Sequence, residues 1–271
     1  MRKEITTEES KAIQLEIAKQ IDEFCSVNGI RYFLNYGTLI GAIRHKGFIP
    51  WDDDIDLGMP RPDYERFVRS FNGAYPGTCL MSPELDQRFC MPFAYVYRED
   101  TLLIEEKITY HQFPIGVKVD VFPIDGAPSD YDRYLAKRKA LKKCKSYLFY
   151  KNVLLGPRWK KDKVLWFKTV VWKLILLPFS IPAIQRRIRK MVATDKYETS
   201  EMADNLAFPN RRNSIVPRSV FEHYTDVEFE GCTFKTLRDY DIYLKAVYED
   251  YMTPPPPEQR IPEHGFHAYW R

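Results

Sequence analysis

Apolar residues recur at helical spacing near the start of the chain. The segment opens with Thr6-Thr7-Glu8-Glu9, whose hydroxyl and carboxylate groups have the order of a helix capping box. The apolar positions that follow are three or four residues apart: Ile13, Ile17, Ile21 and Phe24. This pattern predicts a helix from Thr7 to Val27 that ends near Asn28-Gly29.

Shorter apolar stretches predict a strand, a helix and a second strand over the next thirty residues. We expect a buried strand at 30–35 and a turn entering a helix at 36–47. Acidic and apolar residues alternate over 54–59, which is the periodicity of a strand. Pro60-Arg61-Pro62 should end that strand, and the next helix should begin at Asp63.

Two further segments have strand character. Residues 93–106 have the pattern of a β-hairpin, and 116–125 that of a strand ended by Pro123 and Asp125-Gly126. Helical and strand patterns therefore mix along the chain. They predict an α+β fold with a small mixed β-sheet and flanking helices.

The bulk composition is that of a sizeable globular protein. With 271 residues, 45% of them hydrophobic, the chain can form one large domain or one domain with an insertion. Five cysteines are an odd number, and no CxxC pair occurs, which argues against a disulfide scaffold or a zinc knuckle. The first twenty residues are too charged for a signal peptide, so we expect a cytoplasmic protein.

Basic residues are concentrated between Lys137 and Lys196. This block holds 18 Lys/Arg against two acids, Asp162 and Asp195, while the rest of the chain has a net charge of −12. A basic block on an acidic body indicates a specific anionic partner. We therefore expect three parts: a core at 1–135, a basic, Trp-rich helical insertion at 136–198, and a C-terminal part at 199–271 that completes the core.

An apolar run at 164–184 lies inside the basic block. Two lysines and two prolines interrupt it, so a membrane-spanning helix is not expected: Lys168, Lys173, Pro178 and Pro182. Three tryptophans lie beside the cations, a composition that suits a membrane interface: Trp159, Trp166 and Trp172. The block could thus bind an anionic membrane surface, at the inner face of the plasma membrane, or it could pack on the core of its own domain.

The acidic stretch Asp52-Asp53-Asp54-Ile55-Asp56 is the strongest candidate for chemistry. On a strand, Asp54 and Asp56 lie on one face about 7 Å apart, where two carboxylates can bind one hard divalent cation. Asp120 has the same apolar neighbours on a second expected strand and would be a third ligand if the two strands are adjacent. We predict that these three acids bind Mg²⁺ or Mn²⁺, with Asp52 and Asp53 assisting.

A calcium-binding loop is a second way to read the acidic stretch. An EF-hand loop requires glycine at its sixth position and glutamate at its twelfth, where this chain has Leu57 and Asp63. The EF-hand interpretation therefore fails. A solvated acidic turn and the Asp-x-Asp motif of a glycosyltransferase that uses sugar nucleotides both remain open at this point.

Gly37-Thr38 lies upstream of the acids, at the start of an expected helix. Backbone N–H groups and a hydroxyl there suit a phosphate group. Arg44, His45 and Lys46 follow before the acidic turn and could bind diphosphate oxygens. A glycine followed by a small hydroxyl residue, then Asp-x-Asp and a later third acid, is the order found in the nucleotidyltransferase fold.

The block YGTLIGAIRHKGFIPWDDDIDLGMPRPDYERF, followed by VDVFPIDGAP and YDIYLKAVYEDYMTPPPPEQR, resembles the LicD family. The resemblance runs from the first helix to the proline run. It implies a metal-dependent phosphotransferase with a nucleotidyltransferase-like core, which moves phosphocholine from CDP-choline to a sugar hydroxyl of a cell-surface glycan precursor, for example a polysaccharide or teichoic acid. Relatives such as fukutin-related protein transfer ribitol phosphate.

Carried over by motif, the resemblance implies that Asp54, Asp56 and Asp120 are the metal-binding acids and that Gly37 and Thr38 form the phosphate turn. This chain departs from the family at two places. It has Tyr248-Glu249-Asp250 where Tyr-Gly-Asp is common, and it lacks a proline before Tyr240-Asp241. Because both lie outside the acidic stretch, we expect them to affect substrate detail and not the class of reaction.

Residues of the C-terminal tail are weaker candidates. Arg260, His264 and His267 could reach the donor, but we favour a surface or structural role for each of them. His264-x-x-His267 has the spacing of a zinc pair, but no cysteine lies nearby in sequence, so we do not predict a zinc site. The main alternative function is a nucleotidyltransferase that attaches NMP to a small molecule or protein. Another is a non-enzymatic adaptor that uses the basic block; nucleic acid is not expected as its partner, because no RNA-stacking motif occurs.

Overall fold

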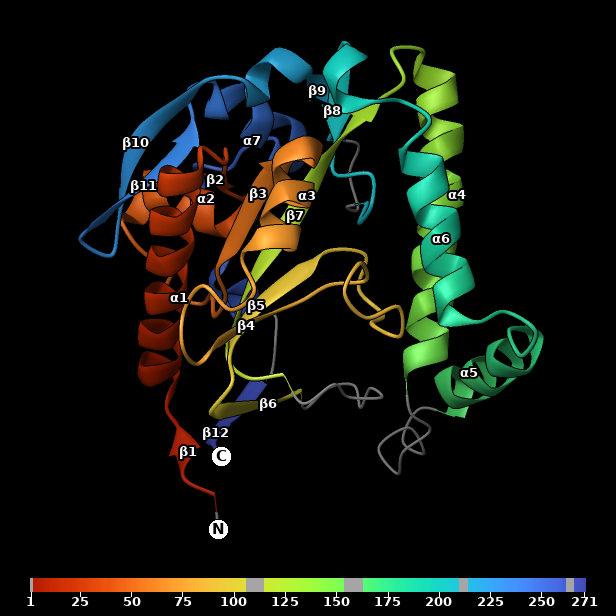
Figure 1. Cartoon of the computed structure of the whole chain (residues 1–271), viewed down its shortest axis with the longest axis horizontal. Helices are drawn as coiled ribbons and strands as arrows, with labels where there is room; N and C mark the ends of the chain where they lie inside the picture. The colour runs from red at the N-terminus through yellow and green to blue at the C-terminus, as the bar shows by residue number, and fades with distance from the viewer. Residues whose placement is uncertain (1, 106–114, 154–162, 210–213, 262–265) are drawn as a thin grey trace.

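The computed structural model of the chain describes residues 2–105, 115–153, 163–209, 214–261 and 266–271. Within these residues the chain forms an α+β fold (Figure 1). The helices are α1 (Thr7–Asn28), α2 (Tyr36–His45), α3 (Arg61–Ser70), α4 (Tyr131–Asn152), α5 (Lys163–Ile175), α6 (Ile181–Val192) and α7 (Tyr240–Tyr248). The strands are β1 (Glu4–Ile5), β2 (Phe33–Leu34), β3 (Asp56–Pro60), β4 (Thr78–Met81), β5 (Ala94–Arg98), β6 (Thr101–Glu105), β7 (Lys118–Ala127), β8 (Met202–Asp204), β9 (Val216–Pro217), β10 (Tyr224–Phe229), β11 (Cys232–Leu237) and β12 (Phe266–Trp270).

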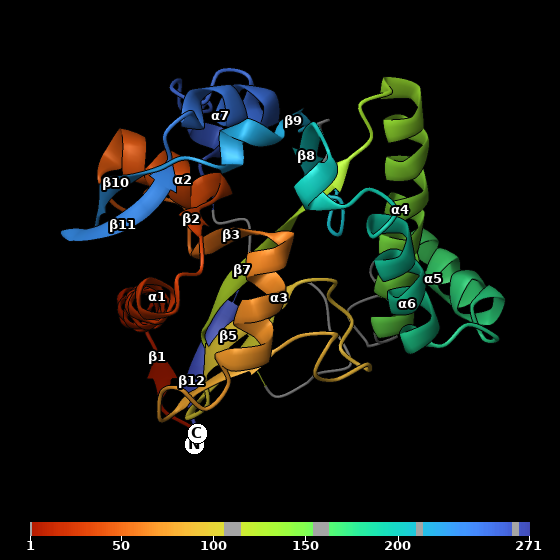
Figure 2. The ribbon, with the colours of Figure 1, turned by 45° about the horizontal axis from the view of Figure 1, so that its top comes forward.

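A mixed sheet forms the centre of the molecule. Its strand order is β2-β3-β7-β5-β4, and β8 and β9 extend it from β7. Strands β3 and β7 are parallel, while the other described pairs of this sheet are antiparallel. A three-stranded sheet β1-β12-β6 and the hairpin β10-β11 complete the β-structure. Figures 1 and 2 show α1 on one side of the sheet and α4, α5 and α6 on the other.

Helix α1 confirms the prediction from the capping box and the apolar spacing. The Thr6 hydroxyl accepts a hydrogen bond from the Glu9 N–H at 3.1 Å, and the Glu9 carboxylate accepts one from the Thr6 N–H at 2.9 Å. Ile13, Ile17 and Ile21 are buried in the main core. The helix ends at Gly29, which has a left-handed φ of 58° that glycine adopts without strain.

The strand predicted at 54–59 is β3, which begins two residues later, at Asp56. The proline pair does end this strand, but α3 starts at Arg61 and not at Asp63. A proline fits the first turn of a helix, because the N–H that it lacks has no partner there. Pro62 therefore lies inside the helix and does not delay its start.

Strand β7 continues beyond the predicted stop at Pro123 and runs to Ala127. Its antiparallel neighbour β5 pairs with it only as far as Val121, and β8 pairs with it from Asp125. Pro123 thus falls between two partners on that edge, where its missing N–H costs no ladder hydrogen bond. The parallel partner on the other edge is β3 throughout this region, with Met59 opposite Pro123.

The predicted hairpin at 93–106 is wrong. Both strands exist, as β5 and β6, but they belong to different sheets. Strand β5 has β4 on one edge and β7 on the other, so it has no free edge for β6. Strand β6 pairs instead with β12 from the end of the chain.

Helices α4, α5 and α6 form an arm beside the sheet (Figure 1). Helices α4 and α6 share a small core of their own, separate from the main one, whose buried residues include Tyr134, Leu141, Leu148, Ile184 and Ile188. The Gln185 amide joins this arm to the β4–β5 connection by donating to the carbonyls of Phe89 and Met91. Among the described residues, no helix is long and apolar enough to cross a membrane.

Candidate active site

Asp56 and Asp120 are directly opposite each other on the parallel strands β3 and β7. The backbone N–H of Asp120 donates to the Ile55 carbonyl at 2.9 Å, and the N–H of Asn35 donates to the Asp56 carbonyl at 2.8 Å. The apolar neighbours Ile55, Leu57 and Val119 are almost completely buried and hold both strands in the core. Asp120 was expected to be a third ligand only if its strand lies next to that of Asp56, and the two strands are indeed neighbours.

Asp52, Asp53 and Asp54 precede β3 and gather their carboxylates. One oxygen of each lies within 4.8 Å of the others. Burial, together with the charge of Asp54 and a hydrogen bond to it, raises the pKa of Asp52 to about 8. The pKa of Asp56 is also raised well above its usual value. Burial is the largest cause, and the charges of Asp54, Asp120 and Asp52 come next. The acids therefore form one electrostatically coupled cluster.

The N-terminus of α2 lies against this acid cluster. A Cβ atom on Gly37 would lie 2.5 Å from Oδ2 of Asp52, so only glycine lets the carboxylate approach the helix so closely. The Thr38 hydroxyl accepts a hydrogen bond from the Asp56 N–H at 2.8 Å. Gly37 and Thr38 thus position two of the acids, and the positive end of the helix dipole faces them. Phosphate binding by this turn stays a prediction.

Lys118 is a part of the site that the sequence analysis missed. Its ammonium group forms a buried ion pair with Asp120 and lies 4.2 Å from the centre of the Tyr95 ring. Burial opposes its charge, but the charge of Asp120 and the hydrogen bond between them raise the pKa of Lys118. The sequence did hold a signal for Lys118: it lies two residues before Asp120, and residues two apart on a strand lie on the same face. Lys118 is the cation that partly balances the acids.

Tyr248, the last residue of α7, also lies within the electrostatic reach of the cluster. Burial raises the pKa of its hydroxyl well above the usual value, and the charge of Asp56 is the next cause. The residue that departs from the family pattern is Glu249, which follows Tyr248, and an effect of this departure on substrate detail stays a prediction. Glu249 follows with φ 62° and ψ −95°, a backbone conformation that favours glycine.

The basic residues Arg44, His45 and Lys46 lie at the other end of α2. Arg44 donates to the Tyr251 carbonyl at 2.8 Å, and burial followed by the charge of Arg260 lowers its pKa. Burial and then Arg44 lower the pKa of His45. Arg44 also donates to Nδ1 of His45 at 3.4 Å. Diphosphate binding by the three basic residues stays a prediction.

The tail candidates are distributed over different places. Arg260 lies over the ring of Trp51, 5.3 Å from its centre. Trp51 directly precedes Asp52, the first acid of the cluster. His267 belongs to β12 and contacts the Glu4 carboxylate at 3.0 Å, in the three-stranded sheet. His264 lies outside the described residues.

The chemistry of the donor set fits a hard divalent cation. All candidate ligands are carboxylate oxygens, the ligands that Mg²⁺ and Mn²⁺ prefer. Their mutual repulsion contributes to the raised pKa of Asp52 and Asp56, and a cation at this point would replace repulsion by attraction. The residues present therefore suit the metal. The carboxylates that converge within 4.8 Å are those of Asp52, Asp53 and Asp54, and metal binding by Asp54, Asp56 and Asp120 together stays a prediction.

Comparison with known proteins gives a family for this arrangement. The model described as LicD/FKTN/FKRP, nucleotidyltransferase domain, matches residues 29–149. This range contains α2, β3 and β7, and with them all the acids of the cluster. The expected nucleotidyltransferase-like core is thus confirmed at the level of the family.

Individual relatives agree with the family. The chain is 29% identical to the lipopolysaccharide cholinephosphotransferase LicD of Haemophilus influenzae, over 98% of this chain and 99% of that protein. It is 46% identical to the human ribitol 5-phosphate transferase FKRP over 44 residues, which are 16% of this chain and 9% of FKRP. Residues 29–149 therefore match the nucleotidyltransferase domain of the LicD/FKTN/FKRP family, and the chain is an enzyme of the LicD phosphotransferase type.

Proposed function

We propose that this enzyme transfers phosphocholine from CDP-choline to a sugar hydroxyl of a cell-surface polysaccharide precursor and releases CMP. The observation that carries the proposal is the similarity to LicD over nearly the full length of both chains. The similarity to the ribitol phosphate transferase is confined to 44 residues, and therefore says little about the donor alcohol. We expect a lipid-linked acceptor and a cytoplasmic site of action.

Phosphoryl transfer requires that negative charge on the diphosphate be balanced as the leaving group departs. We assign Asp54, Asp56 and Asp120 to hold a divalent cation, with Asp52 next to them at the N-terminus of α2. The chemistry supplied by bound Mg²⁺ or Mn²⁺ is neutralisation of charge on the donor diphosphate. The N–H groups at the start of α2 add positive potential at the same place.

In the proposed reaction, the oxygen of the acceptor hydroxyl attacks the phosphorus that carries choline. The bond from this phosphorus to the bridging oxygen breaks, and CMP leaves with that oxygen. An oxygen of Asp120 is assigned to take the hydroxyl proton. Lys118, paired with Asp120, would help to keep this carboxylate ionised and oriented. Arg44, His45 and Lys46 remain candidates for the diphosphate oxygens.

The test is CMP release by the purified enzyme with Mg²⁺, offered CDP-choline, CDP-ribitol and CDP-glycerol separately, each with a lipid-linked glycan extract. Release from CDP-choline alone, with choline phosphate recovered on the glycan, is the expected result. An Asp54→Asn, Asp56→Asn variant is the control and should release none. Release from another donor would change the alcohol, and NMP found on the acceptor would replace the proposal by nucleotidyl transfer.

A further inference from the structure

The tip of the helical arm exposes an unusual amount of apolar surface. Seven of the fifteen exposed large apolar side chains among the described residues lie in this one short segment: Val164, Trp166, Phe167, Leu174, Ile175, Leu177 and Phe179. Phe167 is 64% exposed and Leu177 70%. Single exposed apolar residues are ordinary, but a contiguous group marks an interaction surface. The reaction proposed above gives this surface no role.

Helix α5 has two distinct faces. Val164, Phe167, Leu174 and Ile175 fall within about 100° of its circumference and form one stripe. Away from this stripe the helix faces the protein, where Thr169 is completely buried and the Trp172 ring stacks on Tyr150 at 5.6 Å. The helix is therefore anchored to α4 by one face, and the outward face carries the apolar stripe.

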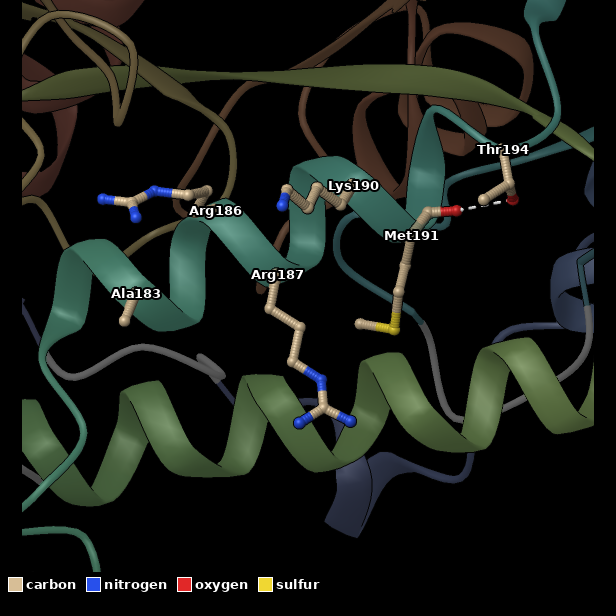
Figure 3. Close-up of a pocket in the computed structure, with 6 residues that line it drawn as sticks. All are labelled: Ala183, Arg186, Arg187, Lys190, Met191 and Thr194. Carbon is tan, nitrogen blue, oxygen red and sulfur yellow. Dashed lines mark hydrogen bonds between the residues drawn. The ribbon is translucent and has the colours of Figure 1, made fainter.

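The surroundings of this stripe are positively charged. Residues 163–192, from the start of α5 to the end of α6, contain seven Lys/Arg and no acid. Arg186, Arg187 and Lys190 line a hollow of about 300 Å³ on α6. Figure 3 shows Arg187 extending toward α4, with Arg186 and Lys190 on another side of α6. No carboxylate among the described residues pairs with these three cations.

The position of the stripe makes it accessible to a broad surface. Helix α4 has 22 residues and is therefore about 33 Å long. Helix α5 lies at the end of the arm that is remote from β8 (Figure 1). No described helix can span a bilayer, so a helix of this kind would lie in the interface, with its apolar face among the acyl chains.

We propose that α5 and the turn after it, residues 163–179, dock on an anionic phospholipid bilayer, with Phe167 and Leu174 inserted and the cations of α6 facing the headgroups. The combination of an apolar stripe with an excess of cations is complementary to such a surface. A second copy fits less well, because a symmetric contact between two arms would bring two blocks of net charge +16 together. The inference goes beyond the proposed reaction and does not depend on the donor.

The test is sedimentation of the full chain with vesicles of phosphatidylcholine alone or mixed with phosphatidylglycerol, at about 0.15 M salt. We expect binding to the mixed vesicles and little binding to phosphatidylcholine. Phe167→Ser with Leu174→Ser should weaken binding at least roughly tenfold, because two large apolar side chains are lost from the bilayer. Val27→Ser with Leu85→Ser is the matched control, since both residues are exposed but lie outside the arm, and it should bind like the wild type.

A second variant keeps the test decisive if the first does not fold. Arg186→Gln, Arg187→Gln and Lys190→Gln together leave the apolar stripe intact and should reduce both the affinity for mixed vesicles and its dependence on salt; Lys19→Gln on α1 is the control. Failure of the wild type to bind mixed vesicles overturns the proposal. So does binding that neither arm variant weakens, or a dimer in light scattering that Phe167→Ser with Leu174→Ser abolishes in the absence of vesicle binding. None of these measurements needs turnover, so they are independent of the proposed reaction.

Discussion

The acidic site and the basic arm both crowd like charges, but they arrange them differently. At the site, the carboxylates of Asp52, Asp53 and Asp54 converge within 4.8 Å, and burial and the neighbouring charges raise the pKa of Asp56. On the arm, the cations are spread over helices and mostly reach solvent, beside exposed apolar side chains. Carboxylates that converge and are partly buried suit one counter-ion bound between them, whereas dispersed cations suit a broad anionic surface.

The comparison is tested most severely at Asp56. Asp56→Asn should lower turnover by about 1,000-fold, because a cation ligand at the reacting centre is lost. The same change should stabilise the metal-free protein by about 1 kcal/mol, because it removes one of the repelling charges. Steady-state kinetics and thermal unfolding check the two effects. Asp132→Asn, an exposed acid on α4, is the control, and a loss of stability in Asp56→Asn would contradict the repulsive cluster.

Gly37→Ala tests the approach of Asp52 to α2. The new Cβ would lie 2.5 Å from the Asp52 carboxylate, so the acid must move, and a displacement of this size should lower turnover by about 100-fold. Circular dichroism should show an intact fold. In an Asp52→Ala background the same change should cost much less, because the atom that it meets is gone. Equal losses in both backgrounds would mean that Gly37 acts by another route.

Metal addition distinguishes the two regions directly. Mg²⁺ at about 100 times its dissociation constant should stabilise the wild type by about 2.7 kcal/mol, since it binds only the folded site. Thermal unfolding with increasing Mg²⁺ measures this gain. It should vanish in the Asp54→Asn, Asp56→Asn variant and persist when Arg186, Arg187 and Lys190 are changed to Gln. A gain that survives loss of the two acids would place the metal elsewhere.

Lys145 makes the cost of crowding in the arm measurable. Burial, followed by Lys142 and Arg138, lowers its pKa to about 8, and its ammonium group lies over the Phe208 ring. Since the unfolded chain keeps this proton up to about pH 10.5, the wild type should gain stability as the pH rises from 8 to 10.5. Lys145→Met should be more stable by about 1 kcal/mol at pH 7, and this advantage should shrink over the same interval.

The control for Lys145 is Lys143→Met, an exposed neighbour on the same helix. Its stability should follow the wild type at every pH in chemical denaturation. If Lys145→Met instead loses stability at pH 7, the contact with Phe208 outweighs the cost of burying the charge.

The smallest effect is expected at the rim of the acidic site. Glu249 has a φ of 62°, where the family commonly has glycine, so Glu249→Gly should stabilise the protein by about 0.5–1 kcal/mol. Glu230→Gly is the instructive contrast. Glu230 also has a positive φ, of 51°, but its carboxylate accepts a hydrogen bond from the Phe48 N–H, so relief of strain is offset there. Denaturant unfolding resolves both, and equal gains would show that the Glu230 bond is unimportant.

Local patterns carried the prediction where local physics decides the structure. The capping box and apolar spacing were enough for α1, and acid–apolar alternation was enough to single out the strands of Asp56 and Asp120. What failed depends on which strands become neighbours. Strand β6 pairs with β12, more than 150 residues away, and Pro123 is tolerated because β7 changes partners beside it. Neither the pairing of β6 with β12 nor the change of partner beside Pro123 can be predicted from the residues of β6 or β7 alone.

The site shows the same division. The acids stand out in sequence because four of them lie in five positions. Tyr248 comes from the other end of the chain, and its place near the acids depends on the packing of α7. Lys118 can be recognised as a neighbour of Asp120 only if residues 118–120 are taken to be in a strand. The hydroxyl of Thr38 was expected to face a phosphate, yet it bonds to the Asp56 N–H, a contact that depends on how α2 and β3 meet.

The arm begins and ends on adjacent strands. The chain leaves the sheet at the end of β7 and returns in β8, with Gly126 opposite Ala203. At Gly126 the returning chain comes so close that a Cβ would lie 2.6 Å from the Asp195 carbonyl oxygen. Chain segments whose ends lie together are the ones that proteins exchange most readily in evolution. An arm of other length or composition could replace this one without moving Asp56 relative to Asp120. The surface on which the enzyme docks can therefore change in evolution independently of the reaction.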